Sequence, residues 1–238
     1  MTKKIVILGT SGNCIDMLDT IACINDEAQE TLHECVGFLD DNTATHGTTR
    51  HGVPVLGPLS LAPELQDCWF VNGIGSTATF TRKDAIIAKA AIPLQRFITL
   101  IHPSARISRT AQIGPGTVIF ENVAVTSNVT IGMHVIILPN SVISHDVVIG
   151  DYTCITGGVC ISGGTHVGKL CYLGTNCSII GGITIGDYSM VGMGSVVLGS
   201  VADNSIVVGN PARFLRHSLS HMAEEVSGQP AQTPFAAG

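Results

Sequence analysis

The stretch Ile143-Ser-His-Asp-Val-Val-Ile149-Gly-Asp-Tyr-Thr-Cys-Ile155 decides the fold of this 238-residue chain. An aliphatic residue recurs at every sixth position, and the same phase continues without a break from Ile101 to Val197. A small residue follows four positions after each of them, as Ser141 does in the hexad that precedes this stretch. Because a helix repeats every 3.6 residues, it cannot use a period of six. The repeat therefore indicates a hexapeptide β-helix.

In such a fold each hexad forms one short strand and a corner, and three hexads close a triangular coil of about eighteen residues. The aliphatic residue fills the interior of the triangle, and the small residue fits beside the turn. A glycine directly after Ile113, Ile131, Ile149 and Ile185 relieves crowding at the bend. We expect this parallel β-helix over residues 101–202.

The residues before the repeat, 1–100, alternate between strand and helix patterns. The predicted strands are residues 3–8, 35–41, 69–76 and 97–100, and helical patterns follow the first and third of them, the later one over 81–91. This alternation predicts a small parallel α/β domain.

The residues after the repeat are expected to close the fold. A short helix over 211–221, within a cap of residues 203–221, would cover the open end of the prism and its unpaired strand groups. Residues 222–238 have the composition of a flexible tail.

Composition excludes several classes of protein. Charged residues are 13% of the chain and the net charge is −6, so no basic stripe is available for nucleic acid. The apolar run Ile5–Leu8 is too short for a signal peptide or a membrane span, and we expect a cytoplasmic protein.

The cysteines are interpreted as packing residues. The eight cysteines include no C-x-x-C pair, which argues against a metal site or a disulfide framework. Cys154 and Cys160, and likewise Cys171 and Cys177, are six residues apart and occupy equivalent hexad positions. At these positions cysteine serves as a small apolar side chain.

The turn after the first predicted strand, Gly9-Thr-Ser-Gly12-Asn13, offers a phosphate site. It lacks the full G-x-G-x-x-G spacing, so the case for a dinucleotide is weak. A glycine approach to a helix N-terminus still suits a phosphate group. Asp40 or Asp41, at the end of the second strand, could accept a hydrogen bond from a ribose or a base, or could simply cap a turn. Together these features favour a bound nucleotide.

Residues eighteen apart stack in columns along the prism, and one pair of columns is unusual. Its third-position column is Ser127, His145, Gly163, Gly181 and Gly199, and its fourth-position column is Asn128, Asp146, Gly164, Gly182 and Ser200. A histidine and an aspartate are thus followed by a strip almost free of side chains. Exposed backbone groups there suit an extended ligand that carries amides, such as the pantetheine arm of coenzyme A.

His145 lies at the start of this strip, where a thioester could end. A neutral imidazole can take a proton from an attacking amine or hydroxyl. Asp146 could fix the tautomer of the imidazole or raise its basicity. The alternative is a solvated turn histidine without a role. His134 and His166 are out of column with His145, so we predict no metal site.

The chain resembles the hexapeptide acyltransferases in which a small Rossmann-like domain precedes a left-handed β-helix. These include N-acetyltransferases of UDP- or GDP-linked 4-amino sugars in bacterial glycan pathways and sialic-acid O-acetyltransferases. The resemblance is carried by residues 5–13, Phe38-Leu-Asp-Asp41, Ile101-His-Pro-Ser-Ala105, Val142-Ile-Ser-His145-Asp146, Gly163-Gly164, Tyr172-Leu-Gly174-Thr175-Asn176 and Gly209-Asn-Pro-Ala-Arg213.

The resemblance implies a homotrimer with acetyl-CoA between neighbouring prisms and a nucleotide sugar in the N-terminal domain. His145 matches the general base and Asp146 its hydrogen-bond partner, while the Gly163 N–H would meet the thioester carbonyl. The implied cofactor-binding residues are Gly163, Gly174, Thr175, Gly181, Gly192, Met193, Pro211 and, on phosphate, Arg213. The implied substrate-binding residues are Gly9, Ser11, Gly12, Asn13, Asp40 and Asp41.

One position departs from the family pattern: Asn13 stands where a histidine is common, and its amide cannot carry charge. The function expected is acetyl-CoA-dependent N-acetylation of a nucleotide-linked 4-amino sugar. O-acetylation of a sialic-acid-type sugar stays open. A third alternative also stays open, in which the front domain binds NAD and the prism serves only as a structural stalk. The glycine column argues against it, because a stalk does not need an edge free of side chains.

Overall fold

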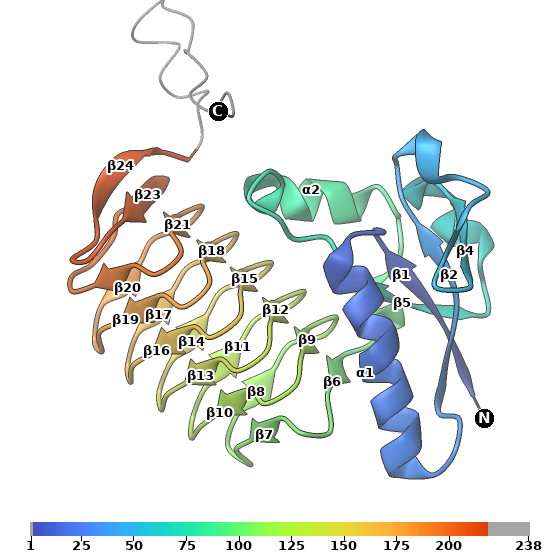
Figure 1. The fold of residues 1–238 in the computed structure, drawn as a ribbon, viewed down its shortest axis with the longest axis horizontal. Helices are drawn as coiled ribbons and strands as arrows, with labels where there is room; N and C mark the ends of the chain where they lie inside the picture. Colours follow the sequence, from blue (N-terminus) through green and yellow to red (C-terminus); the bar gives the residue numbers. More distant parts are fainter. Residues whose placement is uncertain (1, 219–238) are drawn as a thin grey trace, which may run out of the picture.

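The computed structural model describes residues 2–218, which form an α/β domain followed by a prism of short parallel strands (Figure 1). The first part contains β1 (Lys3–Leu8), α1 (Gly12–Ala28), β2 (His33–Leu39), β3 (Thr49–Arg50), β4 (Val53–Gly57), β5 (Cys68–Asn72) and α2 (Lys83–Ala88). Short 3₁₀ helices lie at Thr43–Thr45, Leu59–Glu64, Phe80–Arg82 and Leu94–Arg96.

The sheet of the N-terminal domain has the strand order β3-β4-β2-β1-β5. Strand β1 pairs in parallel with β2 and β5, whereas β3 is an antiparallel edge strand on β4. The predicted strand over residues 3–8 is confirmed as β1. The strand predicted over 35–41 corresponds to β2, which begins and ends two residues earlier, and the strand predicted over 69–76 corresponds to the shorter β5. Because the central strands are parallel, the loops after β1, β2 and β5 meet at one edge.

The prism is built from two-residue strands, each followed by a turn. They are β6 (Leu100–Ile101), β7 (Arg106–Ile107), β8 (Gln112–Ile113), β9 (Val118–Ile119), β10 (Ala124–Val125), β11 (Thr130–Ile131), β12 (Ile136–Ile137), β13 (Val142–Ile143), β14 (Val148–Ile149), β15 (Cys154–Ile155), β16 (Cys160–Ile161), β17 (His166–Val167), β18 (Tyr172–Leu173), β19 (Ser178–Ile179), β20 (Thr184–Ile185), β21 (Met190–Val191) and β22 (Val196–Val197). Strands β23 (Ser205–Val208) and β24 (Arg213–His217) complete the described chain.

These strands form three sheets, one for each side of the triangle. We call the sheet β6-β9-β12-β15-β18-β21-β23-β24 the junction face, β7-β10-β13-β16-β19-β22 the second face, and β8-β11-β14-β17-β20 the third face. From β6 to β22 paired residues are eighteen apart, as Ile143 and Ile161 are, whereas β23 pairs with β21 at a separation of sixteen. The second residue of each strand is the hexad aliphatic, and these side chains form one buried core. The predicted parallel β-helix and its phase are therefore confirmed.

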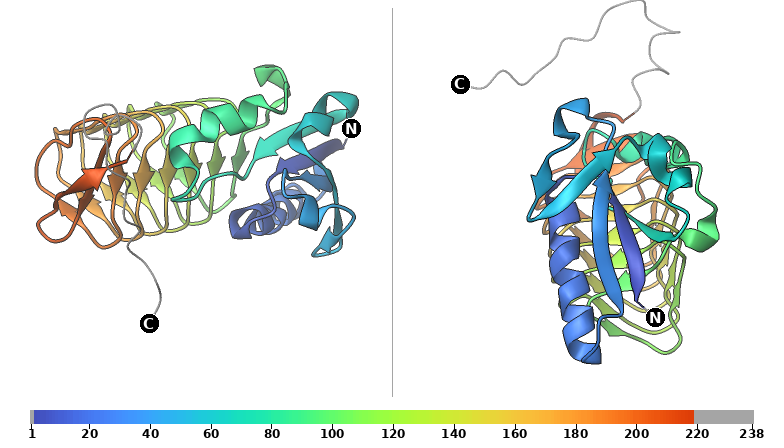
Figure 2. Two further views of the ribbon diagram at one scale, coloured as in Figure 1. Left: turned by 90° about the horizontal axis from the view of Figure 1, so that it is seen from above. Right: turned by 90° about the vertical axis from the view of Figure 1, so that its right-hand side faces the viewer.

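The N-terminal domain covers the end of the prism that begins with β6, and α2 extends over the neighbouring coils (Figures 1 and 2). The two parts share one hydrophobic cluster, in which Ile5 and Phe38 pack with Val118 and Ile136 of the junction face. The junction face is therefore buried on both sides: its inward residues pack in the prism core, and its outward apolar residues pack against the N-terminal domain.

The predicted strand over residues 97–100 is divided between the two parts. Phe97 forms an isolated bridge with Phe70 of β5, whereas Leu100 begins β6 and pairs with β9. The predicted helix over 81–91 is also shorter, because a 3₁₀ turn occupies Phe80–Arg82 and α2 ends at Ala88.

The predicted C-terminal helix over 211–221 is wrong for the residues that the structure describes. Residues Arg213–His217 form β24, which pairs antiparallel with β23. The physical reason is that the edge of β23 offers a row of unpaired backbone groups, and a returning strand satisfies them as well as a covering helix would. Residues 219–221 of that helix and the predicted tail over 222–238 lie outside the described residues.

The cysteines are all free, and only some are packing residues. Cys171 and Cys177 belong to the core of the prism. Cys154 and Cys160 instead precede the inward residue of their strands and point outward. Cys154 is buried beneath the N-terminal domain, but Cys160 is exposed, so the packing interpretation is wrong for Cys160.

Candidate functional site

His145 lies on the corner between the second and third faces, in the turn between β13 and β14. Its Nδ1 is 2.8 Å from Oδ2 of Asp146, and the two side chains are 66% and 56% exposed. Because a carboxylate can only accept this hydrogen bond, Nδ1 is its donor, and in the neutral tautomer that this bond favours Nε2 is an acceptor. The side chain is thus oriented with its basic nitrogen free.

Asp146 is itself held from the preceding coil. The amide of Asn128 donates to Oδ1 of Asp146 at 3.1 Å. The hydrogen bond from His145, and then that from Asn128, lower the pKa of Asp146 below its usual value. The carboxylate is therefore charged at neutral pH and can orient the imidazole.

Gly163 lies directly next to the imidazole, one coil further along. A Cβ built on Gly163 would lie 2.5 Å from Cε1 and 2.6 Å from Nε2 of His145. A side chain at 163 would thus collide with His145, and would not simply project into an open groove as the column suggests. The Gly163 N–H has no acceptor among the described residues, whereas the next N–H, of Gly164, donates to the carbonyl oxygen of His145.

The column of glycines continues to a cavity at the far end of the prism. A Cβ on Gly181 would meet the backbone of Gly163, whereas one on Gly199 would meet nothing within 4 Å. The cavity has a volume of about 520 Å³ and is lined by Gly199 together with Pro211, Arg213 and Phe214. Gly163 and Gly181 thus follow the edge that carries His145, whereas Pro211 and Arg213 line the cavity at the end of the prism, where Arg213 begins β24 of the junction face.

The other predicted cofactor residues lie on a different edge. Gly174, Thr175, Gly192 and Met193 form the corner between the junction face and the second face, after β18 and β21. Thr175 and Met193 are exposed. A Cβ on Gly174 would lie 2.5 Å from the Met193 nitrogen, so this glycine lets the coils stack. Within one chain this group does not meet His145.

A second cavity, of about 470 Å³, lies at the carboxyl edge of the N-terminal sheet. All six predicted substrate-binding residues, Gly9, Ser11, Gly12, Asn13, Asp40 and Asp41, line it. Thr10, Leu59, Ile74, Gly75, Ser76, Thr79 and Ile86 also line it and were not predicted individually. The glycine turn after the third strand could have indicated Ile74 to Ser76, because ends of neighbouring parallel strands meet.

The N-terminus of α1 opens into this cavity. The N–H groups of Gly12 and Asn13 have no acceptor among the described residues, and the N-cap Ser11 makes no side-chain capping bond. In the described part of the chain, no lysine or arginine lines the cavity. An anionic group bound here would therefore be held by backbone N–H groups and the helix dipole.

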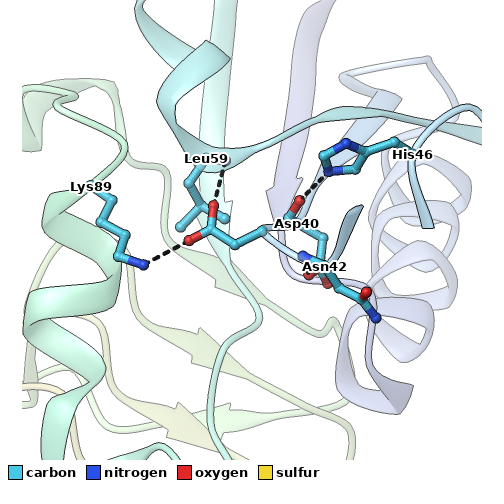
Figure 3. A network of polar contacts seen from close by, with 6 residues as sticks. Asp40, Asn42, His46, Leu59 and Lys89 are labelled. Carbon is cyan, nitrogen blue, oxygen red and sulfur yellow. Dashed lines mark hydrogen bonds and ion pairs between the residues drawn. The ribbon is translucent and has the colours of Figure 1, made fainter. Parts of the chain in front are cut away.

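The two aspartates are fixed by separate contacts (Figure 3). Thr10 donates to Oδ2 of Asp40 at 2.6 Å and the Asn42 N–H to its Oδ1 at 2.8 Å. Lys89 forms a 2.8 Å ion pair with Asp41, and this hydrogen bond is the main reason why the pKa of Asp41 is lowered. Both carboxylates therefore keep their acceptor oxygens in place at the cavity wall.

The two cavities and His145 are not assembled around one point in a single chain. The N-terminal domain packs on the junction face, and the corner that carries His145 is the one opposite that face. A ligand group in the cavity at β1, β2 and β5 is thus separated from His145 by the prism itself.

Among residues 2–218, no group of three or more His, Cys, Asp or Glu is arranged to hold a metal ion. None of the helices in the described part of the chain has the length and apolar character that crossing a bilayer requires.

Part of the prism matches a known family of repeats. Residues 128–163 match the family described as bacterial transferase hexapeptide (six repeats), which places the coil that carries His145 in that repeat class. No curated protein shows significant sequence similarity to the chain.

Solved structures resemble nearly the whole chain. PerB from Caulobacter crescentus, in complex with CoA and GDP-perosamine, has 25% identity and a TM-score of 0.77 over 91% of this chain and 99% of its own. WeeI from Acinetobacter baumannii AYE has 27% identity and a TM-score of 0.74 over 90% and 100%. The acetyltransferase domain of PglB from Neisseria gonorrhoeae FA1090 shares the fold, at 24% identity and a TM-score of 0.76 over 90% and 100%. The chain therefore has the fold expected from the resemblance, a Rossmann-like domain followed by a left-handed β-helix.

Proposed function

We propose that the protein is an acetyl-CoA-dependent N-acetyltransferase that acts on the amino group of a UDP- or GDP-linked 4-amino sugar in bacterial glycan biosynthesis. The observation that carries the proposal is the pair His145–Asp146 at one end of a strip of bare backbone. The similarity to PerB, whose structure holds CoA and GDP-perosamine, supports the same pairing of donor and acceptor.

The donor would lie along the corner that carries His145. Its nucleotide end would occupy the cavity near Pro211 and Arg213, where the guanidinium can meet a phosphate. Its pantetheine arm would pass Gly199 and Gly181, and its thioester would reach Gly163. The unpartnered N–H of Gly163 supports this placement, because it can donate to the thioester oxygen as negative charge develops there.

The acceptor would be held by the cavity at the ends of β1, β2 and β5. The free N–H groups of Gly12 and Asn13 suit its diphosphate, and Asp40 and Asp41 offer acceptors for ribose or base donors. Asn13 can hydrogen-bond to the sugar or phosphate without adding charge.

In the reaction, the amine nitrogen attacks the carbonyl carbon of the thioester. Nε2 of His145 accepts the proton that the nitrogen loses, and Asp146 stabilises the imidazolium that forms. The C–S bond then breaks, the amide is complete, and the proton on His145 is available to the departing thiolate. The hydrogen bond between His145 and Asp146 and the unpartnered N–H of Gly163 support this sequence of steps.

A homotrimer is part of the proposal, because the proposed donor and acceptor sites face away from each other in one chain. Three prisms with their second faces toward a common axis would bring the His145 corner of one against the junction-side corner of the next, where Thr175 and Met193 lie. Exposed apolar side chains near this face, Val142 at 39%, Ile180 at 46% and Leu198 at 60%, support burial there. A cytoplasmic location is also proposed, because acetyl-CoA is a cytoplasmic metabolite.

The test is release of free thiol from acetyl-CoA with a panel of UDP- and GDP-linked 4-amino sugars and with sialic acid. Turnover with a 4-amino nucleotide sugar supports the proposal, and turnover with sialic acid alone would indicate an O-acetyltransferase. No turnover with any acceptor, together with tight NAD binding, would reject both. Light scattering should give a mass about three times the 24.8 kDa of one chain.

A further inference from the structure

Helix α2 is attached to the rest of the molecule by a lysine at each end. Lys83, its first residue, is 0% exposed, and its Nζ donates to the carbonyl oxygen of His134 at 2.7 Å and to Sγ of Cys154 at 3.5 Å. At the other end Lys89 pairs with Asp41 at the wall of the N-terminal cavity. The helix therefore connects the coils of the prism to that cavity.

The environment of Lys83 is unusual for a lysine. Burial lowers the pKa of its amine from the ordinary value, and the nearby Cys154 opposes that shift. No carboxylate of residues 2–218 contacts Nζ, so within the described structure the group is not part of an ordinary ion pair. A buried amine of this kind disfavours a simple packing role, because an apolar side chain would bury at lower cost.

Both partners of Lys83 belong to the prism. His134 occupies a corner of the left-handed type, with φ of 54°, and its carbonyl oxygen accepts from no backbone N–H among the described residues. Lys83 thus satisfies an acceptor that the coil cannot satisfy itself. Cys154 faces outward from β15 into the domain junction.

Cys154, which accepts from Lys83, also lies against the loop that follows β5. A Cβ on Gly75 would be 2.5 Å from Sγ of Cys154, so this backbone rests on the thiol. Gly75, Ser76 and Thr79 of this loop line the N-terminal cavity, as does Ile86 of α2. Phe80, which follows the loop, contacts Tyr172 of β18 with ring centroids 6.0 Å apart.

We propose that Lys83, through its contacts with His134 and Cys154, is a positioning residue that fixes one wall of the nucleotide-sugar cavity on the prism. It sets where α2 and the residues 74–79 lie, and so where the acceptor is held. The identity of the ligand in this inference rests on the proposed function, whereas the mechanical connection rests on the contacts alone.

The experiment compares Lys83→Met with Lys4→Met and Cys154→Ser. Methionine keeps the volume of Lys83 and removes its donors, so the variant is expected to fold. Lys4→Met makes the same chemical change at an exposed residue near the amino end of β1, away from the cavity. Serine at 154 keeps an acceptor for Nζ and tests rescue by a conservative change.

For Lys83→Met we expect the KM for the nucleotide sugar to rise about tenfold, while the KM for acetyl-CoA stays within twofold of wild type. Hydrogen exchange of α2 amides should become faster, because one of its two attachments is lost. Lys4→Met should match wild type, and Cys154→Ser should fall within about threefold of it.

Two results would overturn the inference. One is Lys83→Met with both KM values and α2 exchange unchanged, and the other is an equal rise in both KM values, which would indicate general loosening. Affinity for UDP and GDP, measured by calorimetry, covers the case in which no acetyl transfer occurs. There, wild-type inactivity would reject the proposed function, while a weaker nucleotide affinity of Lys83→Met alone would still support the positioning role.

Discussion

The corner that carries His145 and the cavity of the N-terminal domain are built in opposite ways. The corner is made by stacking equivalent turns, so that His145, Gly163 and Gly181 follow one another along one edge. The cavity is made by three strand ends and the loops after them, and Asp41 in its wall is held by Lys89 from a distant segment. The first site is thus formed mainly by backbone, and the second by contacts between distant segments.

This difference predicts how each region responds to substitution. At Gly163 and Gly181 of the stacked corner one added methyl group reaches the neighbouring coil, so that glycine-to-alanine changes there are expected to be severe. In the cavity single polar contacts are partly exposed and can be replaced by water, so that the same kind of change has a graded effect.

The largest effect is expected at the reacting group of the corner. His145→Ala should lower kcat about 10²-fold or more, because the proton acceptor is lost. Affinity for CoA should stay near that of wild type, since the imidazole contacts only the reacting end. Steady-state kinetics and calorimetry with CoA check both values, and an unaltered kcat would remove His145 from the mechanism.

Gly163→Ala tests whether the corner is limited by backbone space. The added Cβ would meet the His145 ring at 2.5 Å, so the imidazole must move, and we expect kcat to fall at least about tenfold. Gly199→Ala adds the same atom to the same column with nothing within 4 Å. It should keep its kcat at saturating acetyl-CoA and change only the KM for that donor. Equal kcat values for the two variants would contradict the prediction that a side chain at position 163 displaces the imidazole of His145.

Asp146→Asn removes the negative charge beside the imidazole of His145 but keeps the shape of the side chain at position 146. We expect about a tenfold loss of kcat, because the amide no longer fixes the tautomer or stabilises the imidazolium. Since hydrogen bonds lower the pKa of Asp146, its carboxylate is charged throughout the range from about pH 5 to 9, and the loss should be present at every pH in it. A pH–rate series measures this, and a loss confined to one end of the range would argue against the assignment.

The smallest effect is expected in the cavity wall, at the exposed pair of Lys89 and Asp41. Lys89→Met should lower the free energy of unfolding by less than about 1 kcal/mol at neutral pH, since both side chains are substantially exposed. The pKa of Asp41 is lowered in the folded protein, so this contribution is present above the unfolded pKa and is lost as the pH falls through the folded one. Urea unfolding at neutral pH and near pH 3 checks the sign. A difference that grows in acid would contradict it.

The repeat made the prism predictable from the sequence. A strict period of six fixes which residue of each hexad points inward, and every column then follows by adding eighteen residues. His145, Gly163 and Gly181 could therefore be placed on one edge, and the interior aliphatic residues are all in phase with the observed strands. The residues that line the cavity after β1 and β2 could also be named, because parallel strand ends meet.

Contacts without periodicity could not be predicted in this way. Leu59 and Ile86 reach the cavity from segments whose packing depends on the whole N-terminal domain. The chain after the last hexad has no phase to follow, and β24 formed where a covering helix was predicted. The burial of Cys154 and the exposure of Cys160 also depend on which face the N-terminal domain covers, which the repeat does not encode.

The regular height of the coils makes the prism a molecular ruler. Gly199 lies three coil steps beyond His145, which at the spacing of adjacent strands is about 14 Å. Inserting one complete coil between them would preserve every inward residue and every hydrogen-bond ladder, yet would shift the two ends of the proposed donor site by about 4.8 Å. An enzyme lengthened in this way would fold normally but would no longer match the length of its acyl carrier.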